Sequence, residues 1–252
     1  MPRELPTTVI CSPAMSRDDP SGYHDKAAVA ARVRAGERRA MIGAPTDELW
    51  VKIGSIQFEF LKTQGLKPTD RLPDIGCGCL RGGIKFVAYL EAGHYFGTDL
   101  NRSLLDEGYD VELAQLGLTG KLPRSNLIED GAFDYSWADG VRFDFALAQS
   151  VFTHLPLDQL STCLRNLERV VVPGGQFFVT FFEVPRDYPP DASFTHQPGG
   201  IVTHRNRNPY HCSARDLAAS AAGTAWVADY IGDWGHPRAQ KMMGFRRPSS
   251  AR

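Results

Sequence analysis

A glycine-rich segment preceded by an acidic residue is the part of this sequence best suited to chemistry with a ligand. Residues 72–83 read LPDIGCGCLRGG, with Asp74 at the end of a short apolar run and glycines at positions 76, 78, 82 and 83. Glycine loses more conformational freedom on folding than any other residue, so such a cluster indicates strained dihedral angles or a ligand lying on the backbone. At a turn from a strand into a helix, such a loop can hold a nucleotide beside the helix N-terminus.

The spacing of these glycines argues against a pyrophosphate ligand. The third position of a GxGxxG fingerprint is occupied by Arg81, and no Gly-Lys-Ser/Thr follows as in a phosphate-binding P-loop. A second acidic residue, Asp99, ends the next strand-like run, where a carboxylate can accept hydrogen bonds from both ribose hydroxyls. Together, Asp74 and Asp99 suit a ligand without phosphates that offers an ammonium group and a ribose diol.

The elements that must position these residues alternate between strand and helix. Strands are expected at 72–75, 94–98, 126–129, 143–148 and 176–182, with helices at 82–91, 102–116 and 157–171 between them. A helix at 213–222 and strands at 225–231 and 240–246 follow, and helices are expected at 26–41, interrupted by Gly36, and from Thr46 to Gly65. This alternation predicts a parallel sheet with helices on both faces.

Composition limits the class of partner. The net charge of −1 and the pI near 6.7 give no general attraction to nucleic acid or anionic membranes. No apolar run reaches the roughly 20 residues that cross a bilayer, and the N-terminal apolar stretch is too short for a secretory signal, so we expect a cytoplasmic protein. The five cysteines lack the spacing of a zinc site or a disulfide scaffold, and we interpret Cys77 and Cys79 as small loop residues.

Four segments together resemble the class I S-adenosylmethionine-dependent methyltransferases, over about residues 70 to 246. Asp74–Gly78 (DIGCG) matches their first motif, in a GCGxLRGG variant, and Tyr95–Asp99 (YFGTD) matches the acidic end of their second strand. Phe143–Leu155 is similar to their fourth strand with the segment after it, and Val172–Val179 to their turn into the fifth strand. The resemblance implies an α/β fold: a Rossmann-like, doubly wound, seven-stranded sheet of order 3-2-1-4-5-7-6 with strand 7 antiparallel.

The same resemblance implies that S-adenosylmethionine lies across the carboxyl ends of strands 1 and 2. The residues expected to bind it are Asp74, Gly76, Cys77, Gly78, Leu80, Arg81, Asp99, Leu100, Asp130 and Gln149. Leu80 stands where the family often has a third alternating glycine. The acidic residue expected after strand 3, near the adenine, is Asp130 or Asp134, and we favour Asp130.

Two regions lie outside the shared core. We expect residues 1–45 to be an N-terminal extension, partly helical or irregular, that forms a lid over a methyltransferase domain spanning 46–252. Residues 184–212 form an insertion after the fifth strand that is too long for a simple turn, and long loops in compact domains tend to be functional or disordered. We expect the insertion to cap the acceptor side of the site.

The candidate catalytic residue is His154, which follows the fourth strand. Histidine suits a base that removes a hydroxyl proton near neutral pH. The alternative interpretations are that His154 caps the helix starting near Pro156, or packs against the cofactor pocket. The late histidines, at 196, 204, 211 and 236, lack diagnostic metal-ligand spacing, and no metal is predicted.

The function predicted is methyl transfer from S-adenosylmethionine to a hydroxyl of a small molecule, such as a sugar-containing or secondary metabolite. The alternatives are a methyltransferase acting on RNA or protein, and a non-catalytic cofactor-binding protein. Asn208-Pro-Tyr210 resembles the NPPY motif of amino-group methyltransferases but lies beyond the fifth strand, so it does not support those substrates. We expect a small-molecule acceptor, no membrane and no nucleic acid as partners, and leave a homodimer open.

Overall fold

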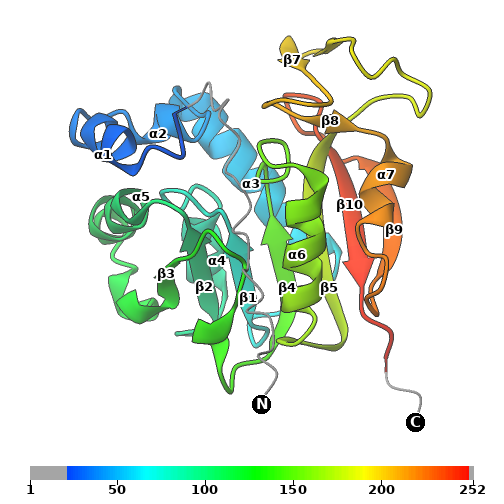
Figure 1. Ribbon diagram of the computed structural model, residues 1–252. Helices are drawn as coiled ribbons and strands as arrows, with labels where there is room; N and C mark the ends of the chain where they lie inside the picture. The colour runs from blue at the N-terminus through cyan, green and yellow to red at the C-terminus, as the bar shows by residue number, and fades with distance from the viewer. Residues whose placement is uncertain (1–21, 250–252) are drawn as a thin grey trace, which may run out of the picture.

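A central sheet with helices on both faces forms the body of the protein. The computed structural model describes residues 22–249, so the irregular N-terminal segment expected from the sequence lies almost wholly outside the described residues. The sheet order is β3-β2-β1-β4-β5-β10-β9, and β10 is antiparallel to both of its neighbours (Figure 1). The seven strands of this order are β1 (Leu72–Ile75), β2 (Tyr95–Asp99), β3 (Leu127–Glu129), β4 (Phe143–Ala148), β5 (Val171–Glu183), β9 (Val227–Asp233) and β10 (Lys241–Arg246), and a short eighth strand, β8 (His211–Cys212), pairs with β5 outside it. The predicted order and the antiparallel last strand are confirmed.

The helices divide between the two faces of this sheet. They are α1 (Lys26–Arg34), α2 (Arg38–Met41), α3 (Asp47–Thr63), α4 (Gly83–Tyr89), α5 (Arg102–Glu107), α6 (Leu157–Leu167) and α7 (Ala214–Ala219). In β5, Phe177 packs into the cluster under α6 and α7, whereas the next residue, Phe178, packs into the cluster under α3 and α4. Successive side chains of a strand point to opposite faces, and both faces are covered here, so residues 177–182 of β5 are buried and, apart from Thr180, apolar.

The N-terminal helices form largely where the sequence places them. The helix expected at 26–41 is divided around Gly36, which has a left-handed φ of 84°. α3 begins after Thr46, whose hydroxyl accepts a hydrogen bond from the backbone N–H of Leu49 at 3.3 Å. A side-chain acceptor at this position satisfies one of the N–H groups that the first turn leaves without a partner.

The helix expected at 102–116 is irregular in the structure. α5 ends at Glu107 and continues as a π-helix, η1 (Gly108–Leu113). At Gly108 this helix passes so close to the glycine loop that a Cβ atom would lie 2.7 Å from Cγ of Leu80. The helix thus supports the loop from below through a residue without a side chain.

The insertion after β5 has secondary structure of its own. β6 (Phe194–His196) and β7 (Ile201–Thr203) form an antiparallel hairpin, and β8 (His211–Cys212) pairs in parallel with the end of β5. The insertion lies with α1 and α2 at the upper end of the molecule in Figure 1, above the carboxyl ends of the parallel strands. Both regions outside the core therefore meet at the edge where the site is expected.

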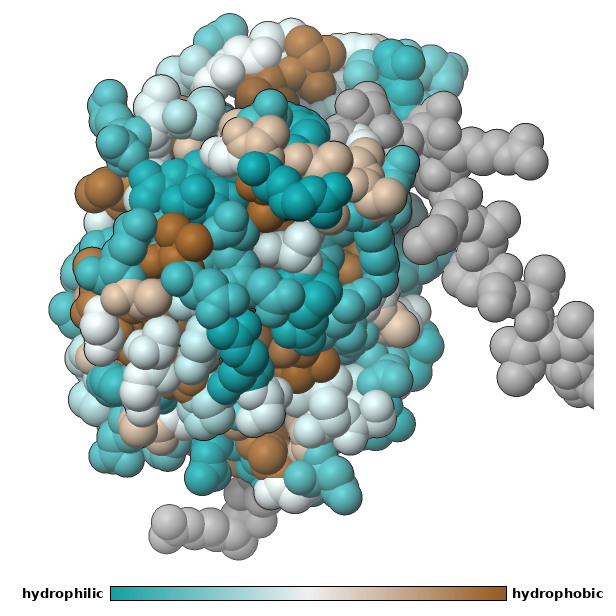
Figure 2. Space-filling view, turned by 90° about the vertical axis from the view of Figure 1, so that its left-hand side faces the viewer, coloured by the Kyte–Doolittle hydropathy of each residue, from teal (hydrophilic) through white to brown (hydrophobic). Residues whose placement is uncertain are grey.

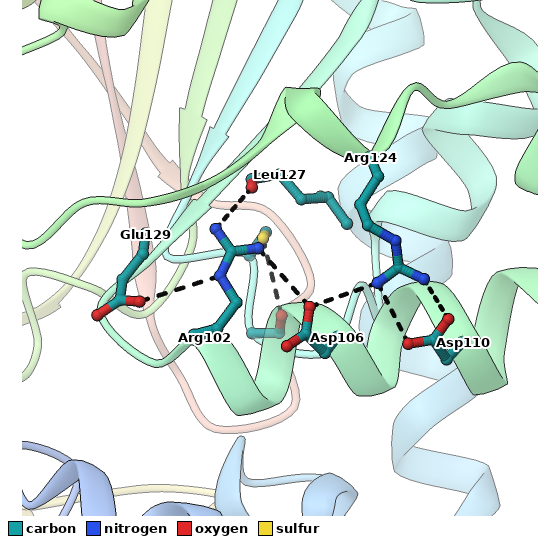
Figure 3. Close-up of polar contacts among 8 residues, drawn as sticks. Arg102, Asp106, Asp110, Arg124, Leu127 and Glu129 are labelled. Carbon is teal, nitrogen blue, oxygen red and sulfur yellow. Dashed lines mark hydrogen bonds and ion pairs between the residues drawn. The ribbon is translucent and has the colours of Figure 1, made fainter.

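Ion pairs cover the β3 edge of the sheet. Arg102 lies 3.7 Å from the carboxylate of Asp106 and 3.9 Å from that of Glu129, and Arg124 bridges Asp106 and Asp110 (Figure 3). On this side of the molecule the hydrophobic side chains are scattered among hydrophilic ones (Figure 2). Charged side chains on an edge strand oppose pairing with another chain. No helix among residues 22–249 is long and apolar enough to cross a membrane.

Candidate cofactor and active site

The glycine loop between β1 and α4 has the backbone conformation that its glycines predict. Gly76 and Gly78 have φ values of 69° and 57°, in the left-handed region that residues with a Cβ rarely adopt. A Cβ atom on Gly78 would lie 2.7 Å from Cγ2 of Ile42, a residue of the N-terminal extension. The loop therefore has close neighbours above it, and its conformation needs glycine for two separate reasons.

Leu80 keeps the same left-handed conformation without being glycine. Its φ is 67°, and its side chain is fully buried in the core cluster beneath the loop. The structure thus explains how leucine replaces the family's third glycine: burial of the side chain offsets the strained backbone. Leu80, one of the predicted binding residues, points its side chain into the core. It could therefore contact a ligand through its backbone alone.

Asp99, at the carboxyl end of β2, lies directly against the glycine loop. Its carboxylate accepts hydrogen bonds from the backbone N–H groups of Gly78 and Asn101, both at 2.9 Å. The hydroxyl of Tyr23 donates to the same carboxylate, at 2.9 and 3.1 Å from its two oxygens. Burial raises the pKa of Asp99, and the hydrogen bonds from Asn101, Tyr23 and Gly78 act in the opposite direction.

Asp74 is buried beside the other end of the loop. Its carboxylate accepts a hydrogen bond of 2.9 Å from the hydroxyl of Tyr95. Burial raises the pKa of Asp74 to about 7, although the bond from Tyr95 lowers it. The loop is therefore bounded by two buried carboxyl groups, as the sequence predicted, and Cys77 lies buried between them.

The two candidates for the acidic residue after β3 occupy different environments. The backbone N–H of Asp130 donates to the carbonyl of Asp99 at 3.0 Å, which places Asp130 beside the end of β2. Asp134 is exposed, and its carboxylate accepts bonds from the N–H and hydroxyl of Ser136, both at 2.8 Å. Leu100 is half-buried, and a Cβ on Gly131 would lie 2.6 Å from its Cδ1. The backbone of Asp130 thus lies beside Asp99, and the choice of Asp130 over Asp134 as the residue near the adenine stays a prediction.

Arg81 and Gln149 form the inner wall of the site. Arg81 is 7% exposed and donates to the carbonyl of Ile42 at 3.1 Å and to the side-chain oxygen of Gln149. Within residues 22–249 its Nε has no hydrogen-bond partner and no carboxylate forms an ion pair with it. Burial lowers the pKa of Arg81 to about 10. A buried cation without a counter-charge is costly, so this position favours an anionic ligand group.

His154 lies on the loop after β4, close to the glycine loop. Its backbone N–H donates to the carbonyl of Val151 at 2.9 Å, and Val151 is the residue that a Cβ on Gly76 would meet. The ring Nδ1 of His154 lies 2.7 Å from the side-chain oxygen of Asn208, and the N–H of Tyr210 donates to the carbonyl of Thr153 at 2.7 Å. The insertion thus brings Asn208 and Tyr210 to this loop from more than fifty residues away.

The other late histidines make hydrogen bonds within the insertion or with the inner wall. His196 Nε2 lies 2.9 Å from Thr203 Oγ1, which lies 2.8 Å from His211 Nδ1. Burial lowers the pKa of His196 to about 4 and that of His236 to about 3. Both rings are therefore neutral near pH 7. Among the described residues no group of three or more His, Cys, Asp and Glu side chains could hold a metal ion.

Several residues of the site could not be found by sequence reasoning. Tyr23 and Ile42 come from the N-terminal extension, Asn101 follows Asp99, and Gln57 of α3 donates to Gln149 at 3.2 Å. None of them belongs to a local pattern. Asn101 is the exception, because its position two residues after Asp99, at a strand end that the sequence identifies, could have indicated that it belongs to the site.

A glycine loop after β1, a carboxylate at the end of β2 and an antiparallel β10 between β5 and β9 are features of one fold, that of the class I S-adenosylmethionine-dependent methyltransferases. A family described as a methyltransferase domain matches residues 74–177, from the loop to the middle of β5. The match covers the part of the chain that holds the glycine loop, Asp99 and β4, and the fold is that of this class.

Three solved structures show the same fold. Magnesium protoporphyrin IX methyltransferase (ChlM) from Synechocystis PCC 6803, with bound S-adenosylmethionine, aligns with a TM-score of 0.61 and 12% identity over 92% of this chain and 100% of its own. An O-methyltransferase family protein from Burkholderia thailandensis aligns with a TM-score of 0.61 and 15% identity, over 91% of this chain and 64% of its own. The CcbJ methyltransferase from Streptomyces caelestis aligns with a TM-score of 0.57 and 14% identity, over 77% of this chain and 95% of its own. At these identities the likeness lies in the fold.

The residues present at the site fit S-adenosylmethionine. Two buried polar atoms have no partner within residues 22–249, the Nε of Arg81 and the side-chain oxygen of Asn101. The first can donate to the carboxylate of the cofactor and the second can accept from its nucleoside, beside Asp99.

Proposed function

We propose that this protein transfers the methyl group of S-adenosylmethionine to a hydroxyl oxygen of a small molecule, with His154 as the general base. The cofactor supplies an electrophilic methyl group, and the acceptor oxygen must lose a proton as it attacks. Such transfer depends mainly on alignment of the acceptor with the methyl group, and an acid–base group adds typically 100-fold or more.

The observation that carries this proposal is the contact of 2.7 Å between His154 Nδ1 and the oxygen of Asn208. An amide oxygen only accepts hydrogen bonds, so Nδ1 carries the proton and the basic lone pair of the neutral ring lies on Nε2. His154 is exposed on the loop that also contacts the glycine loop through Val151. A histidine that only capped α6 would not need its tautomer fixed by a residue of the insertion.

The residues of the chain divide the work accordingly. Asp99, Asn101 and Asp130 would hold the nucleoside, and Arg81 the carboxylate, of the cofactor. Gln149 fixes Arg81 in place, and the loop carrying His154 closes the site next to the reacting group. Asn208 holds the ring of His154 so that Nε2 can take the acceptor proton.

Two neighbours support a small-molecule acceptor, since one is named for magnesium protoporphyrin IX and another as an O-methyltransferase family protein. The near-neutral charge of the chain agrees with this substrate class more than with RNA.

The experiment is methyl transfer from labelled S-adenosylmethionine to a panel of phenols, sugars and hydroxylated heterocycles. His154→Ala should bind S-adenosylhomocysteine as wild type does and lose about 100-fold or more in turnover. Asp158→Ala, an exposed change at the start of α6, is the matched control and should keep full turnover. Unchanged turnover in His154→Ala would refute the base, and labelling of RNA or protein in place of every small molecule would refute the acceptor class.

A further inference from the structure

A cavity of about 420 Å³ lies between the start of α6, the end of β5, α7 and β8. Its wall comes partly from the core, through Phe152, Leu155 and Phe181, and partly from the insertion, through Arg205 and Tyr210. Neither part of the chain encloses it alone. The volume lies within the range of small-molecule sites, which is about 300–1,000 Å³.

The wall of this cavity is aromatic and aliphatic at depth and polar at its rim. Phe152 and Phe181 are 3% and 1% exposed, and Leu155 and Tyr210 are half-buried. At the rim, Arg205 lies 3.7 Å from the carboxylate of Asp216. Since the two charges are paired, the rim as a whole offers little attraction to a strongly charged ligand.

The cavity is lined by chain neighbours of His154 and Asn208. Leu155 follows His154 in the chain and lines the cavity, and Tyr210, two residues after Asn208, lines it from the other side. The bond from the N–H of Tyr210 to the carbonyl of Thr153 joins the two walls. A ligand in the cavity would therefore lie against the loop that carries His154.

We propose that this cavity binds the body of the methyl acceptor, and that the acceptor is an uncharged, hydroxylated aromatic compound of about two fused rings. This inference rests on the proposed function for the identity of the ligand as acceptor. A sugar presents hydroxyls on every side and would leave them without partners against Phe152 and Phe181, whereas an aromatic ring stacks on such walls. A single hydroxyl at the His154 end is the group that would be methylated.

The test uses 2-naphthol as the probe, titrated by its fluorescence into protein saturated with S-adenosylhomocysteine. Ala219 lines the cavity from the exposed side of α7, so Ala219→Trp should fill the mouth without disturbing the core. Ala222→Trp, three residues further on and also exposed, does not line the cavity and is the matched control. We expect Ala219→Trp to weaken 2-naphthol binding by at least about 10-fold and Ala222→Trp to leave it unchanged.

Affinity for S-adenosylhomocysteine should be the same in wild type and both variants, which shows that each variant is folded. Equal binding of 2-naphthol by wild type and Ala219→Trp, or no binding by wild type up to its solubility limit, would overturn the assignment of the cavity. Methyl transfer to the bound probe is measured separately. Binding that depends on position 219 without any transfer would contradict the proposed function and still support the cavity as a site for aromatic ligands.

Discussion

At the scale of single residues, the site is unusual in how few of its charges are paired. Asp74 and Asp99 are buried carboxyl groups beside the glycine loop, and Arg81 is a buried cation whose hydrogen bonds within residues 22–249 go to neutral oxygens. A protein keeps such groups at a cost in stability, and active sites are where this cost is commonly found.

Asp74 gives a prediction of pH dependence. Burial holds its pKa at about 7 in the folded protein, above the value of 3.8 expected in an unfolded chain. The folded protein therefore keeps a proton that the unfolded chain releases, so stability is lost as pH rises through this window. Asp74→Asn removes this ionisable group and with it the pH-dependent loss of stability. In urea unfolding without cofactor, the free energy of unfolding of Asp74→Asn relative to that of wild type should therefore rise by about 2 kcal/mol between pH 5 and pH 8.

The control for this prediction is Glu59→Gln, at a carboxylate whose side chain is 63% exposed. Its stability relative to wild type should not change across the same pH range. If the stability difference between Asp74→Asn and wild type is also independent of pH, then Asp74 ionises in the folded state as it does in the unfolded chain.

At the scale of elements, the glycine loop and the helices beneath it depend on one another. η1 approaches the loop through Gly108, and α4 begins where the loop ends. Leu80 joins the two by placing a fully buried side chain under a left-handed backbone. The loop is therefore held from below by packing and needs no ligand for its conformation.

Leu80 allows this strain to be measured. Both Leu80→Ala and Leu80→Gly lose the buried side chain, at about 2–5 kcal/mol, but only glycine is relieved of the positive φ. Leu80→Gly should thus be more stable than Leu80→Ala by about 1 kcal/mol in urea unfolding.

Leu104, fully buried within α5, is the matched position with ordinary helical backbone. There the order should reverse, with Leu104→Gly less stable than Leu104→Ala by about 1 kcal/mol. The same order at both positions would contradict the strain at Leu80.

At the scale of the whole molecule, two distant regions close over the carboxyl edge of the sheet. The N-terminal extension places Ile42 over Gly78 and Tyr23 on Asp99, and Lys26 forms an ion pair with Glu129 at the sheet edge. Arg238 donates to the carbonyl of Gly43 and packs against Gly199 of the insertion, so it joins the two regions. The roles of the extension as a lid and of the insertion as a cap stay predictions.

Tyr23 provides a test of the lid. Its hydroxyl occupies the same carboxylate of Asp99 that the ribose hydroxyls would need. If the cofactor displaces it, Tyr23→Phe removes a competing hydrogen bond of about 1 kcal/mol and should tighten S-adenosylhomocysteine binding by about 5-fold in calorimetry. Tyr89→Phe, whose hydroxyl bonds to the carbonyl of Leu66 away from the site, is the control. Weaker binding by Tyr23→Phe would show that the tyrosine stays in place as part of the cofactor site.

The sequence by itself determined the sheet and the loop, because both depend on local rules. Alternating strand and helix patterns implied the parallel sheet, and the glycines at 76 and 78 implied the left-handed turn next to an acidic strand end. The order of the strands came from a family resemblance, and the sheet confirms it.

Only the tertiary structure decided what surrounds these elements. The contacts of Asn208 with His154 and of Tyr23 with Asp99 join residues that are 54 and 76 positions apart in the chain. The strands of the insertion lie in a segment rich in proline and glycine. No local periodicity encodes such contacts, because they form between loops whose paths are fixed by packing against the finished sheet. The hydrogen bond from the backbone N–H of Asp130 to the carbonyl of Asp99 is likewise visible only in the fold, because the sequence merely places Asp130 and Asp134 after β3.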